Sequence, residues 1–213
     1  RIAGSHFAGD MGGPHSFVLR QPLGVVAAIL PWNFPVDLLA WKIGPGLAAG
    51  CTFVVKPSEE APLSVLLLAQ SLLAAGLPAG VINVVTGGGA GGAALVAHPQ
   101  VDKIAFTGST EVGRKIMEAA ASNLKRVSLE LGGKSPNVIF ADADVAKSIK
   151  GATWAVFSNS GPECVAGSRL FVERDVYDQV VDGLAAEAQK IRVGNGFTNV
   201  HLGPLVSQEQ LER

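Results

Sequence analysis

Short apolar runs alternate with longer, mixed segments along most of this chain. The runs have the length and composition of strands that are buried on both faces. They cover residues 24–30, 52–55, 81–85, 103–106 and 126–129. The segments predicted to be helices cover residues 36–49, 62–75, 91–97 and 110–121. This alternation predicts an α/β fold built on a doubly wound, parallel, Rossmann-like sheet.

Two of these helices carry more detailed predictions. The sequence Gly44-Pro45-Gly46 is expected to interrupt the first helix, because proline removes a backbone donor and clashes with the preceding turn. In the helix at 110–121, helical periodicity places Val112, Ile116 and Ala119 on one side.

The pattern restarts after Gly132 and Gly133, with strands at 137–140 and 168–172 and helices at 144–157 and 177–191. Residues 1–22 are polar and rich in glycine, which is typical of an arm or hairpin. The predicted organisation is therefore an arm at 1–22, a sheet domain at 23–132, and the start of a second α/β domain at 133–213.

Charge and hydropathy exclude some classes of partner. The net charge of -1 gives no electrostatic basis for binding nucleic acid or an anionic membrane. Residues 61–101 contain no Asp, Glu, Lys or Arg, but Pro62, Pro78 and the glycines of 87–92 break this stretch into short elements. None is long enough to cross a bilayer, so no membrane span is predicted.

The cysteines and histidines indicate the redox compartment and whether a metal site is expected. The two cysteines, Cys51 and Cys164, do not form a disulfide framework, so a reducing compartment, the cytoplasm, is expected. The histidines are scattered without metal-ligand spacing, so no metal site is predicted. No signal peptide opens the chain, and both ends, at Arg1 and Arg213, are expected to be cuts in a longer protein.

Cys164 is the candidate nucleophile. Small and turn-forming residues flank it from Asn159 to Arg169, so the thiol is predicted to lie in a loop between a helix and a strand. The alternative is a buried structural cysteine, which is the commoner fate of a free thiol. Cys51 matches that alternative, because it leads directly into a core strand.

Glu130 and Asn33 are candidates for acid–base and oxyanion chemistry. Glu130 lies between two leucines at a strand end, where partial burial would raise its pKa towards the range of a general base. Asn33 lies between Pro31 and Pro35, where a rigidly held amide can donate to a developing oxyanion. The alternatives are an exposed strand-end charge and a turn asparagine that bonds its own backbone.

The segment 56–59 follows the second predicted strand, at the end where α/β sheets bind ligands. There Glu59 can accept hydrogen bonds from a ribose and would repel a 2′-phosphate, although a charged surface loop is the alternative. Two glycine clusters compete for a phosphate. The cluster at 87–92 matches G-x-G-x-x-G but lacks the downstream acid. The segment 106–113 opens a helix that Ser109 can cap, with Glu111 expected to face solvent.

Taken together, these motifs resemble those of the aldehyde dehydrogenase superfamily over nearly the whole chain. The motifs are Pro31-Trp-Asn-Phe-Pro35, Trp41-Lys42, Lys56-Pro-Ser-Glu59, Phe106-Thr-Gly-Ser-Thr110, Glu130-Leu-Gly-Gly-Lys134 and Cys164 with Gly167-Ser-Arg169. The resemblance implies oxidation of a small-molecule substrate, an aldehyde, to a carboxylic acid, with NAD as the hydride acceptor and NADP as a possible replacement. It also implies a homo-oligomeric parent protein.

The resemblance assigns a role to each motif residue. Cys164 would attack the aldehyde, Asn33 would hold the oxyanion, Glu130 would activate water, and Lys42 would support the cofactor or a proton path. The implied cofactor-binding residues are Trp32, Lys56, Ser58, Glu59, Gly88, Phe106, Thr107, Gly108, Ser109, Gly113 and Leu131. The implied walls of the substrate tunnel are Phe34, Trp41 and Ser158.

The resemblance also gives the domains their functions. Residues 23–132 would form part of the dinucleotide-binding domain, and residues 133–213 the N-terminal part of the catalytic domain. Glu130 favours hydrolysis over transfer to coenzyme A, and Glu59 favours NAD.

Two residues depart from the family pattern. Pro162 stands where Gln or Glu is usual, and Ser158 stands where many members have an aromatic residue. Pro162 and the expected truncation of the chain leave an inactive fragment or pseudoenzyme, which keeps only the dinucleotide-binding scaffold, as one alternative. A different Rossmann oxidoreductase that uses Gly87, Gly89 and Gly92 is another. The identity of the aldehyde does not follow from the sequence.

Overall fold

The computed structural model describes residues 3–212, without the side chain of Met11. Arg1, Ile2 and Arg213, which belong to the predicted arm and the predicted second domain, lie outside these residues. The chain forms two compact units, Arg1–Glu130 and Leu131–Arg213.

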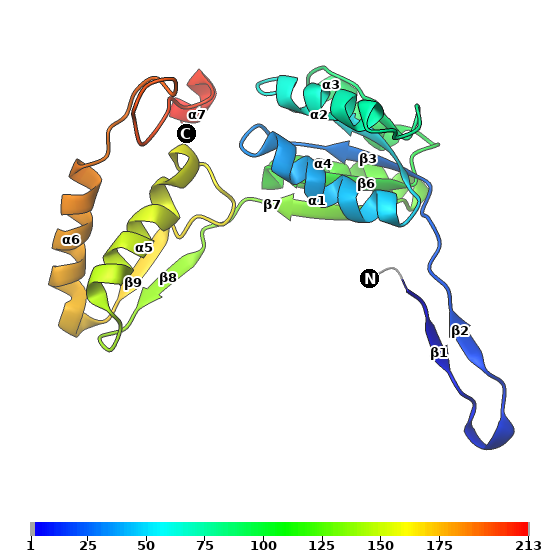
Figure 1. Cartoon of the computed structure of the whole chain (residues 1–213), viewed down its shortest axis with the longest axis horizontal. Helices are drawn as coiled ribbons and strands as arrows, with labels where there is room; N and C mark the ends of the chain where they lie inside the picture. Colours follow the sequence, from blue (N-terminus) through cyan, green and yellow to red (C-terminus); the bar gives the residue numbers. More distant parts are fainter. Residues whose placement is uncertain (1–2, 213) are drawn as a thin grey trace. The chain divides into compact units, whose positions relative to one another are not determined.

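The first unit begins with a hairpin. Strands β1 (Ser5–Phe7) and β2 (Ser16–Val18) pair antiparallel, and the short 3₁₀ helix η1 (Asp10–Gly12) lies between them (Figure 1). The rings of His6, His15 and Phe17 stack against one another on this hairpin.

The main sheet of the first unit has five strands in the order β5-β4-β3-β6-β7. Strand β3 pairs parallel with both β4 and β6, and β4 pairs parallel with β5. Because β6 returns to the side of β3 opposite β4, the winding reverses at β3, and the predicted doubly wound α/β fold is confirmed. The strands are β3 (Val25–Ile29), β4 (Thr52–Lys56), β5 (Ile82–Val84), β6 (Lys103–Gly108) and β7 (Arg126–Leu131).

Helices cover both faces of this sheet. Helices α1 (Pro35–Ala48) and α2 (Leu63–Ala74) pack on the face that carries Val26, Ala28 and Leu30 of the β3 segment. Alternate residues of a strand point to opposite faces, so Ile29 lies on the other face. There α3 (Gly89–Ala97) approaches it, and α4 (Thr110–Ala120) packs beside α3, followed by the 3₁₀ helix η2 (Ala121–Asn123).

Helix α1 runs without a break through Pro45, so the predicted interruption at residues 44–46 is wrong. Proline in a helix interior costs about 3 kcal/mol. Burial of Leu38, Leu39 and Ile43 against the sheet offsets this cost, because each side chain contributes about 1.5–3 kcal/mol. Gly46 allows the helix to pack closely, since a Cβ atom there would lie 2.2 Å from the ring of Phe53.

The buried side of α4 differs from the predicted one. Gly113, Ile116 and Ala120 are buried, whereas Val112 and Ala119 are exposed. Both sets follow helical spacing through Ile116, so periodicity alone does not distinguish them. The smallest side chain, Gly113, faces inward, which allows the helix backbone to lie closer to the rest of the unit.

The second unit is a β-α-β arrangement followed by further helices. Strands β8 (Pro136–Ile139) and β9 (Arg169–Val172) pair parallel and are connected through α5 (Val145–Phe157), as expected for the start of a second α/β domain. Asp144 caps α5 by accepting a hydrogen bond from the amide of Lys147. The remaining elements are η3 (Ser158–Ser160), η4 (Arg174–Val176), α6 (Tyr177–Gln189) and α7 (Gln208–Glu212).

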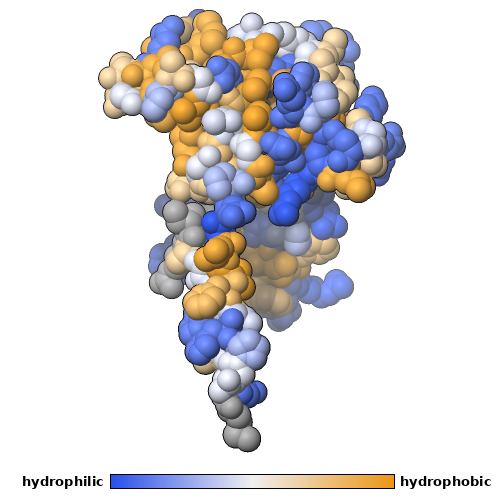
Figure 2. Space-filling model, turned by 90° about the vertical axis from the view of Figure 1, so that its right-hand side faces the viewer, coloured by the Kyte–Doolittle hydropathy of each residue, from blue (hydrophilic) through white to orange (hydrophobic). Residues whose placement is uncertain are grey.

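Hydrophobic side chains are exposed in both units. Leu63 and Leu67 of α2 are 78% and 64% exposed, and Phe197 is fully exposed. Figure 2 shows hydrophobic surface, in orange, over the part that contains the main sheet and along the hairpin. Between residues 3 and 212, each helix is too short or too polar to cross a membrane.

Candidate active site

The predicted site residues of the first unit gather where its parallel strands end. Trp32, Asn33 and Phe34 follow β3, the segment from Lys56 to Glu59 follows β4, and Phe106 to Ser109 lie at and beyond the end of β6. Gly88 precedes α3, in the connection that follows β5. Because these strands are parallel, their carboxyl ends lie along one edge of the sheet, the usual ligand-binding edge of an α/β fold.

The segment after β4 places a buried cation beside an exposed carboxylate. The side chain of Lys56 is 7% exposed, and its amine lies 3.3 Å from Oε2 of Glu59, which is 57% exposed. The amine also donates to the carbonyl of Pro57 at 3.1 Å. A hydrogen bond from the backbone of Glu59, reinforced by the charge of Lys56, lowers the pKa of the Glu59 carboxyl. Glu59 is therefore an ionised acceptor at neutral pH.

Glycines of the α3 segment lie close to these side chains. A Cβ atom at Gly88 would lie 3.7 Å from Oε1 of Glu59, and one at Gly92 would lie 3.6 Å from Cδ of Lys56. Ser58, between the two charged residues, is buried. The segment after β4 is therefore held against the beginning of α3.

The segment after β6 contains a close packing contact and a helix cap. Phe106 and Thr107 are buried, and a Cβ atom at Gly108 would lie 2.4 Å from the Phe106 ring. Ser109 caps α4, and its hydroxyl accepts a hydrogen bond from the amide of Val112 at 3.2 Å. Gly113, one turn further along α4, is buried.

Glu111 lies in the first turn of α4 and faces solvent, as predicted. Its side chain is 73% exposed and lies 2.6 Å from the amine of Lys115. The carboxylate therefore does not oppose an anion inside the site.

Lys42 and Glu130 lie near each other on the α1 side of the sheet. The amine of Lys42 donates to the hydroxyl of Thr107 at 2.5 Å. Burial lowers the pKa of Lys42, and the negative charge of Glu130 opposes part of that shift. A cavity of about 430 Å³ lies beside them, and its lining includes Trp41, Lys42, Ser128 and Glu130. Trp41 is 61% exposed, whereas Phe34 packs against the hydrophobic core.

The expected partial burial of Glu130 is not observed. Its side chain is exposed in the described part of the chain. The reason is the position of β7 at the edge of the sheet, where Glu130 alternates with the half-buried Leu129 and Leu131. The sequence could not show which strand would lie at the edge.

Cys164 and Ser158 belong to the second unit, where both are half-buried, whereas Cys51 in the first unit is buried. The loop from α5 to β9 carries the thiol, and Asn159, Ser160 and Gly161 adopt positive φ angles of 45°, 61° and 94°. Gly161 accommodates this conformation without strain, because it lacks a Cβ atom.

Hydrogen bonds fix the loop on both sides of the cysteine. The amide of Gly167 donates to the carbonyl of Ala155 at 3.0 Å, and the amide of Glu163 donates to the carbonyl of Gly161 at 2.8 Å. Pro162, which has no amide hydrogen, lies between Gly161 and Glu163, the two residues that the second hydrogen bond joins.

One contact in this loop was not predicted from the sequence. The hydroxyl of Ser158 donates to Oε1 of Glu163 at 2.8 Å. Glu163 directly precedes Cys164, and an acidic residue at that position was the signal that could have been noticed.

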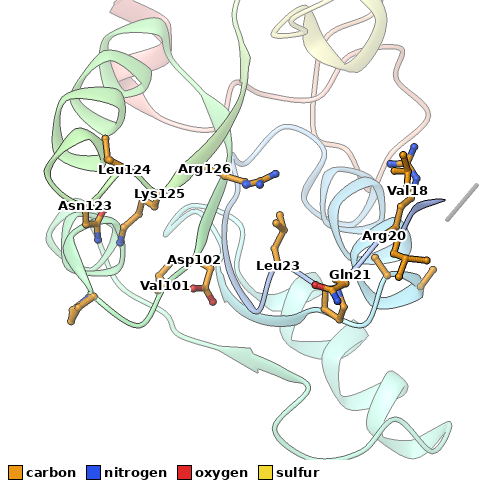
Figure 3. Close-up of a pocket in the computed structure, with 15 residues that line it drawn as sticks. Val18, Arg20, Gln21, Leu23, Val101, Asp102, Asn123, Leu124, Lys125 and Arg126 are labelled. Atoms are coloured by element: carbon orange, nitrogen blue, oxygen red, sulfur yellow. The ribbon is translucent and has the colours of Figure 1, made fainter. Parts of the chain in front are cut away.

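The first unit has a second, larger hollow. Its volume is about 980 Å³, and its lining includes Arg20, Leu23, Asp102, Lys125 and Arg126 (Figure 3). Asp102 fixes the start of β3 there, because its carboxylate accepts a hydrogen bond from the amide of Val25 at 2.8 Å. Within residues 3–212, none of the predicted catalytic or cofactor-binding side chains lines this hollow, and no group of three His, Cys, Asp or Glu side chains is arranged to hold a metal ion.

Comparison with known proteins identifies the chain. Residues 1–213 match the aldehyde dehydrogenase family. The chain belongs to this family. It is 54% identical to phenylacetaldehyde dehydrogenase of Pseudomonas fluorescens over 195 residues, which cover 91% of this chain and 39% of that protein. It is 46% identical to the NADP-dependent succinate-semialdehyde dehydrogenase GabD of Escherichia coli over 215 residues, which cover 100% of this chain and 45% of GabD.

Solved structures share the fold. PnpE in complex with nicotinamide adenine dinucleotide has 48% identity and a TM-score of 0.94, with 99% of this chain and 44% of PnpE covered. The chain thus spans about two fifths of the length of the relatives that it matches. The resemblance inferred from its motifs is confirmed at the level of the family.

Proposed function

We propose that the protein containing this chain oxidises an aldehyde to a carboxylic acid, with NAD as the hydride acceptor. One observation carries the proposal: Cys164, the candidate nucleophile, lies half-buried in a hydrogen-bonded loop of a chain that matches the aldehyde dehydrogenase family from end to end. The substrate remains a class rather than a compound, because the relatives are named for different aldehydes.

The carboxyl edge of the main sheet has features that suit a dinucleotide. Glu59 offers an ionised acceptor for ribose hydroxyls, and Lys56 holds it in place. Gly88 has no Cβ atom, and a Cβ atom placed there would lie within van der Waals distance of the Glu59 carboxylate. The glycine therefore leaves space free beside this carboxylate. The amides at the start of α4 suit an anion, and Ser109 orients this end of the helix.

NAD is proposed over NADP because Glu59 would repel a 2′-phosphate. NADP remains the alternative, since the relative GabD is named as NADP-dependent. Trp32, Thr107, Gly113 and Leu131 are proposed to complete the cofactor site.

Each catalytic residue has a defined task in the proposed reaction. Cys164, as the thiolate, bonds to the carbonyl carbon, and the amide of Asn33 with the backbone N–H of Cys164 holds the resulting oxyanion. The bound cofactor supplies the hydride acceptor. Loss of the hydride leaves a thioester on Cys164, and Glu130 removes a proton from the water that hydrolyses it. Lys42, on the Glu130 side of the sheet, is proposed to support the cofactor or a proton path.

The test of this function is NADH formation from a panel of aldehydes by a full-length protein that contains this sequence. Cys164→Ala should abolish turnover, whereas Glu130→Gln should leave an initial burst of NADH followed by slow turnover. The burst is expected because thioester formation precedes the step that needs Glu130. A normal steady-state rate in Glu130→Gln would remove this residue from the mechanism.

A non-catalytic dinucleotide-binding protein is the second candidate, and Pro162 in the cysteine loop is the observation that favours it. Alkylation by iodoacetamide at neutral pH separates the two. An activated Cys164 should react stoichiometrically and much faster than the buried Cys51. Equal, slow labelling of both thiols would support the non-catalytic candidate.

A further inference from the structure

Glu163 places a carboxylate next to the candidate nucleophile. It directly precedes Cys164, and adjacent Cα atoms are about 3.8 Å apart. Both residues are half-buried. Any molecule that bonds to the sulfur of Cys164 therefore comes close to the backbone of Glu163.

The position of the Glu163 side chain is fixed by Ser158. The Ser158 hydroxyl donates to Oε1 of the carboxylate at 2.8 Å, and the amide of Gly161 donates to the carbonyl of Ser158 at the same distance. These bonds close a turn in which Asn159, Ser160 and Gly161 have positive φ angles. The loop that follows α5 (Figure 1) thus holds one oxygen of the carboxylate, and Ser158 brings no positive charge to it.

The negative charge has no ionic partner in the described part of the chain. The ion pairs among residues 3–212 join Lys56 to Glu59, Lys115 to Glu111, Lys147 to Asp144, and Lys190 to Glu187. None involves Glu163. A half-buried charge is screened less by water and salt than a fully exposed one, so it acts on nearby charged groups.

We infer that Glu163 is a specificity-determining residue that favours aldehydes bearing a cationic group, such as an ammonium or trimethylammonium group close to the carbonyl. The inference rests on the proposed function, in which the aldehyde carbon bonds to Cys164. A cation a few bonds from that carbon lies close enough to the carboxylate to be attracted, whereas a carboxylate-bearing aldehyde is repelled. An uncharged aldehyde of the same shape feels neither effect.

A purely structural role for the Ser158–Glu163 contact is the alternative. If the contact only closes the turn, removing the charge changes loop stability and affects all substrates alike. A role in specificity changes the ratio between cationic and anionic molecules. The ratio of rates for cationic and anionic molecules therefore distinguishes the two roles.

The first experiment probes the charge at the thiol without using aldehyde turnover. The 213-residue chain is labelled with two methanethiosulfonates, one carrying a trimethylammonium group and the other a sulfonate group. The Cys164 thiolate attacks the sulfur bound to the charged group, forms a disulfide with it and releases methanesulfinate. Both reagents need the same thiolate, so the ratio of their rates cancels any change in thiolate fraction.

Glu163→Gln should lower the ratio of cationic to anionic labelling by about three- to tenfold, as expected for a unit charge a few ångströms away in a partly solvated site. Glu163→Asp keeps the charge and should retain most of the ratio, which also shows that the loop tolerates substitution. Asp182→Asn is the matched control, because it removes one exposed negative charge from α6 of the same unit. Cys164→Ala identifies the labelled thiol.

An unchanged ratio in Glu163→Gln would overturn the inference. So would an equal fall in Asp182→Asn, because the effect would then come from overall charge rather than from Glu163.

The second experiment measures substrate preference in a full-length protein that contains this sequence. The aldehydes are trimethylammonioacetaldehyde, its uncharged isostere 3,3-dimethylbutanal, and a carboxylate-bearing aldehyde. Glu163→Gln should lower kcat/KM for the cationic aldehyde relative to the isostere by about three- to tenfold and raise the relative value for the anionic one. Ser158→Ala, which keeps the charge, should change these ratios less than Glu163→Gln.

The two experiments distinguish failure of the inference from failure of the proposed function. Oxidation of all three aldehydes with ratios that Glu163→Gln leaves unchanged overturns the inference alone. If no aldehyde is oxidised, the proposed function fails and the role in specificity fails with it, even where the labelling ratio responds to Glu163.

Discussion

At the scale of single residues, Glu59 and Lys56 illustrate how a buried base can hold an exposed acid. Lys56 extends from the end of β4 with its amine buried, and the amine donates hydrogen bonds to the Pro57 carbonyl and the Glu59 carboxylate. The carboxylate keeps access to solvent. This arrangement makes Glu59 the residue through which the choice of cofactor can be tested.

Glu59→Gln should raise kcat/KM for NADP relative to NAD by about tenfold. The expected reason is the removal of a negative charge that opposes the 2′-phosphate, an effect of about 1.4 kcal/mol. Initial rates with both cofactors in a full-length protein measure the ratio. Exchanging Glu60, the exposed neighbour, for Gln is the control, and an equal change in both variants would point to overall charge instead.

Lys42 should make stability depend on pH in the alkaline range. Its pKa is lowered in the folded protein, mainly by burial, so below the folded pKa the charged amine destabilises the fold in full. As pH rises from the folded pKa towards the unfolded value of about 10.4, the folded state loses its proton first and this destabilisation disappears.

The difference in melting temperature between the unmodified chain and Lys42→Met should therefore shift in favour of the unmodified chain as pH rises through that window. Lys115→Met, which changes an exposed lysine, controls for general alkaline effects. A difference in melting temperature that is constant with pH would contradict a lowered pKa of Lys42 in the folded protein.

At the scale of elements, α1 and α4 show how packing decides what periodicity leaves open. Helix α1 continues through Pro45 because its buried residues are on the sheet side, and Gly46 allows it to approach Phe53. Helix α4 turns Gly113 inward and leaves Val112 exposed. In α1 the close approach of Gly46 to Phe53, and in α4 the burial of Gly113, decide what the hydrophobic pattern leaves open.

Gly46→Ala should destabilise the chain by about 1–3 kcal/mol, because the new methyl group would overlap the ring of Phe53, itself buried in the core. Gly44→Ala is a matched control in the same helix. An added Cβ atom there meets nothing within 4 Å, so it should be neutral or stabilise by up to about 1 kcal/mol. Urea unfolding measures the free energy of unfolding of both variants. Equal changes would show that the close approach of Gly46 to Phe53 does not affect stability.

The glycine segments before α3 and α4 can be distinguished by NAD binding. Gly108→Ala introduces a methyl group that would collide with the Phe106 ring, so it should displace the segment before α4 and weaken NAD binding by about tenfold. Gly89→Ala adds a methyl group to open space and should leave the affinity nearly unchanged. The opposite outcome, measured by calorimetry, would favour a Rossmann oxidoreductase that uses the segment 87–92 for the pyrophosphate.

At the scale of the whole molecule, the chain exposes many large hydrophobic side chains in both units. Exposed side chains include Leu63, Leu67 and Phe197, and Figure 2 shows hydrophobic surface over the part that holds the main sheet. The chain spans about two fifths of its relatives' length, so in those relatives further residues are available to cover such surface.

The 213-residue chain should therefore associate with itself at micromolar concentration. Exchange of Leu63 and Leu67 for Gln should reduce this association, because it removes two exposed apolar side chains from one helix. Sedimentation velocity over a range of concentrations measures the effect. Exchange of the less exposed Leu73 of the same helix is the control, and a monomeric unmodified chain would contradict the expectation.

The amino-acid sequence by itself determined the parallel α/β architecture, the order of its strands along the chain, and membership of the aldehyde dehydrogenase family. These depend on local features, namely the alternation of apolar runs with helices and short motifs such as Glu130-Leu-Gly-Gly-Lys134. The candidate thiol, base and cofactor residues were named from the same motifs, and their roles stay predictions.

Only the tertiary structure decided which residues are covered and which side chains meet. It placed Glu130 on an exposed edge strand, kept α1 continuous through Pro45, and brought Ser158 to Glu163. The physical reason is that burial and side-chain contacts depend on neighbours distant in the sequence, or on loop dihedrals such as those of residues 159–161, which a local pattern does not specify.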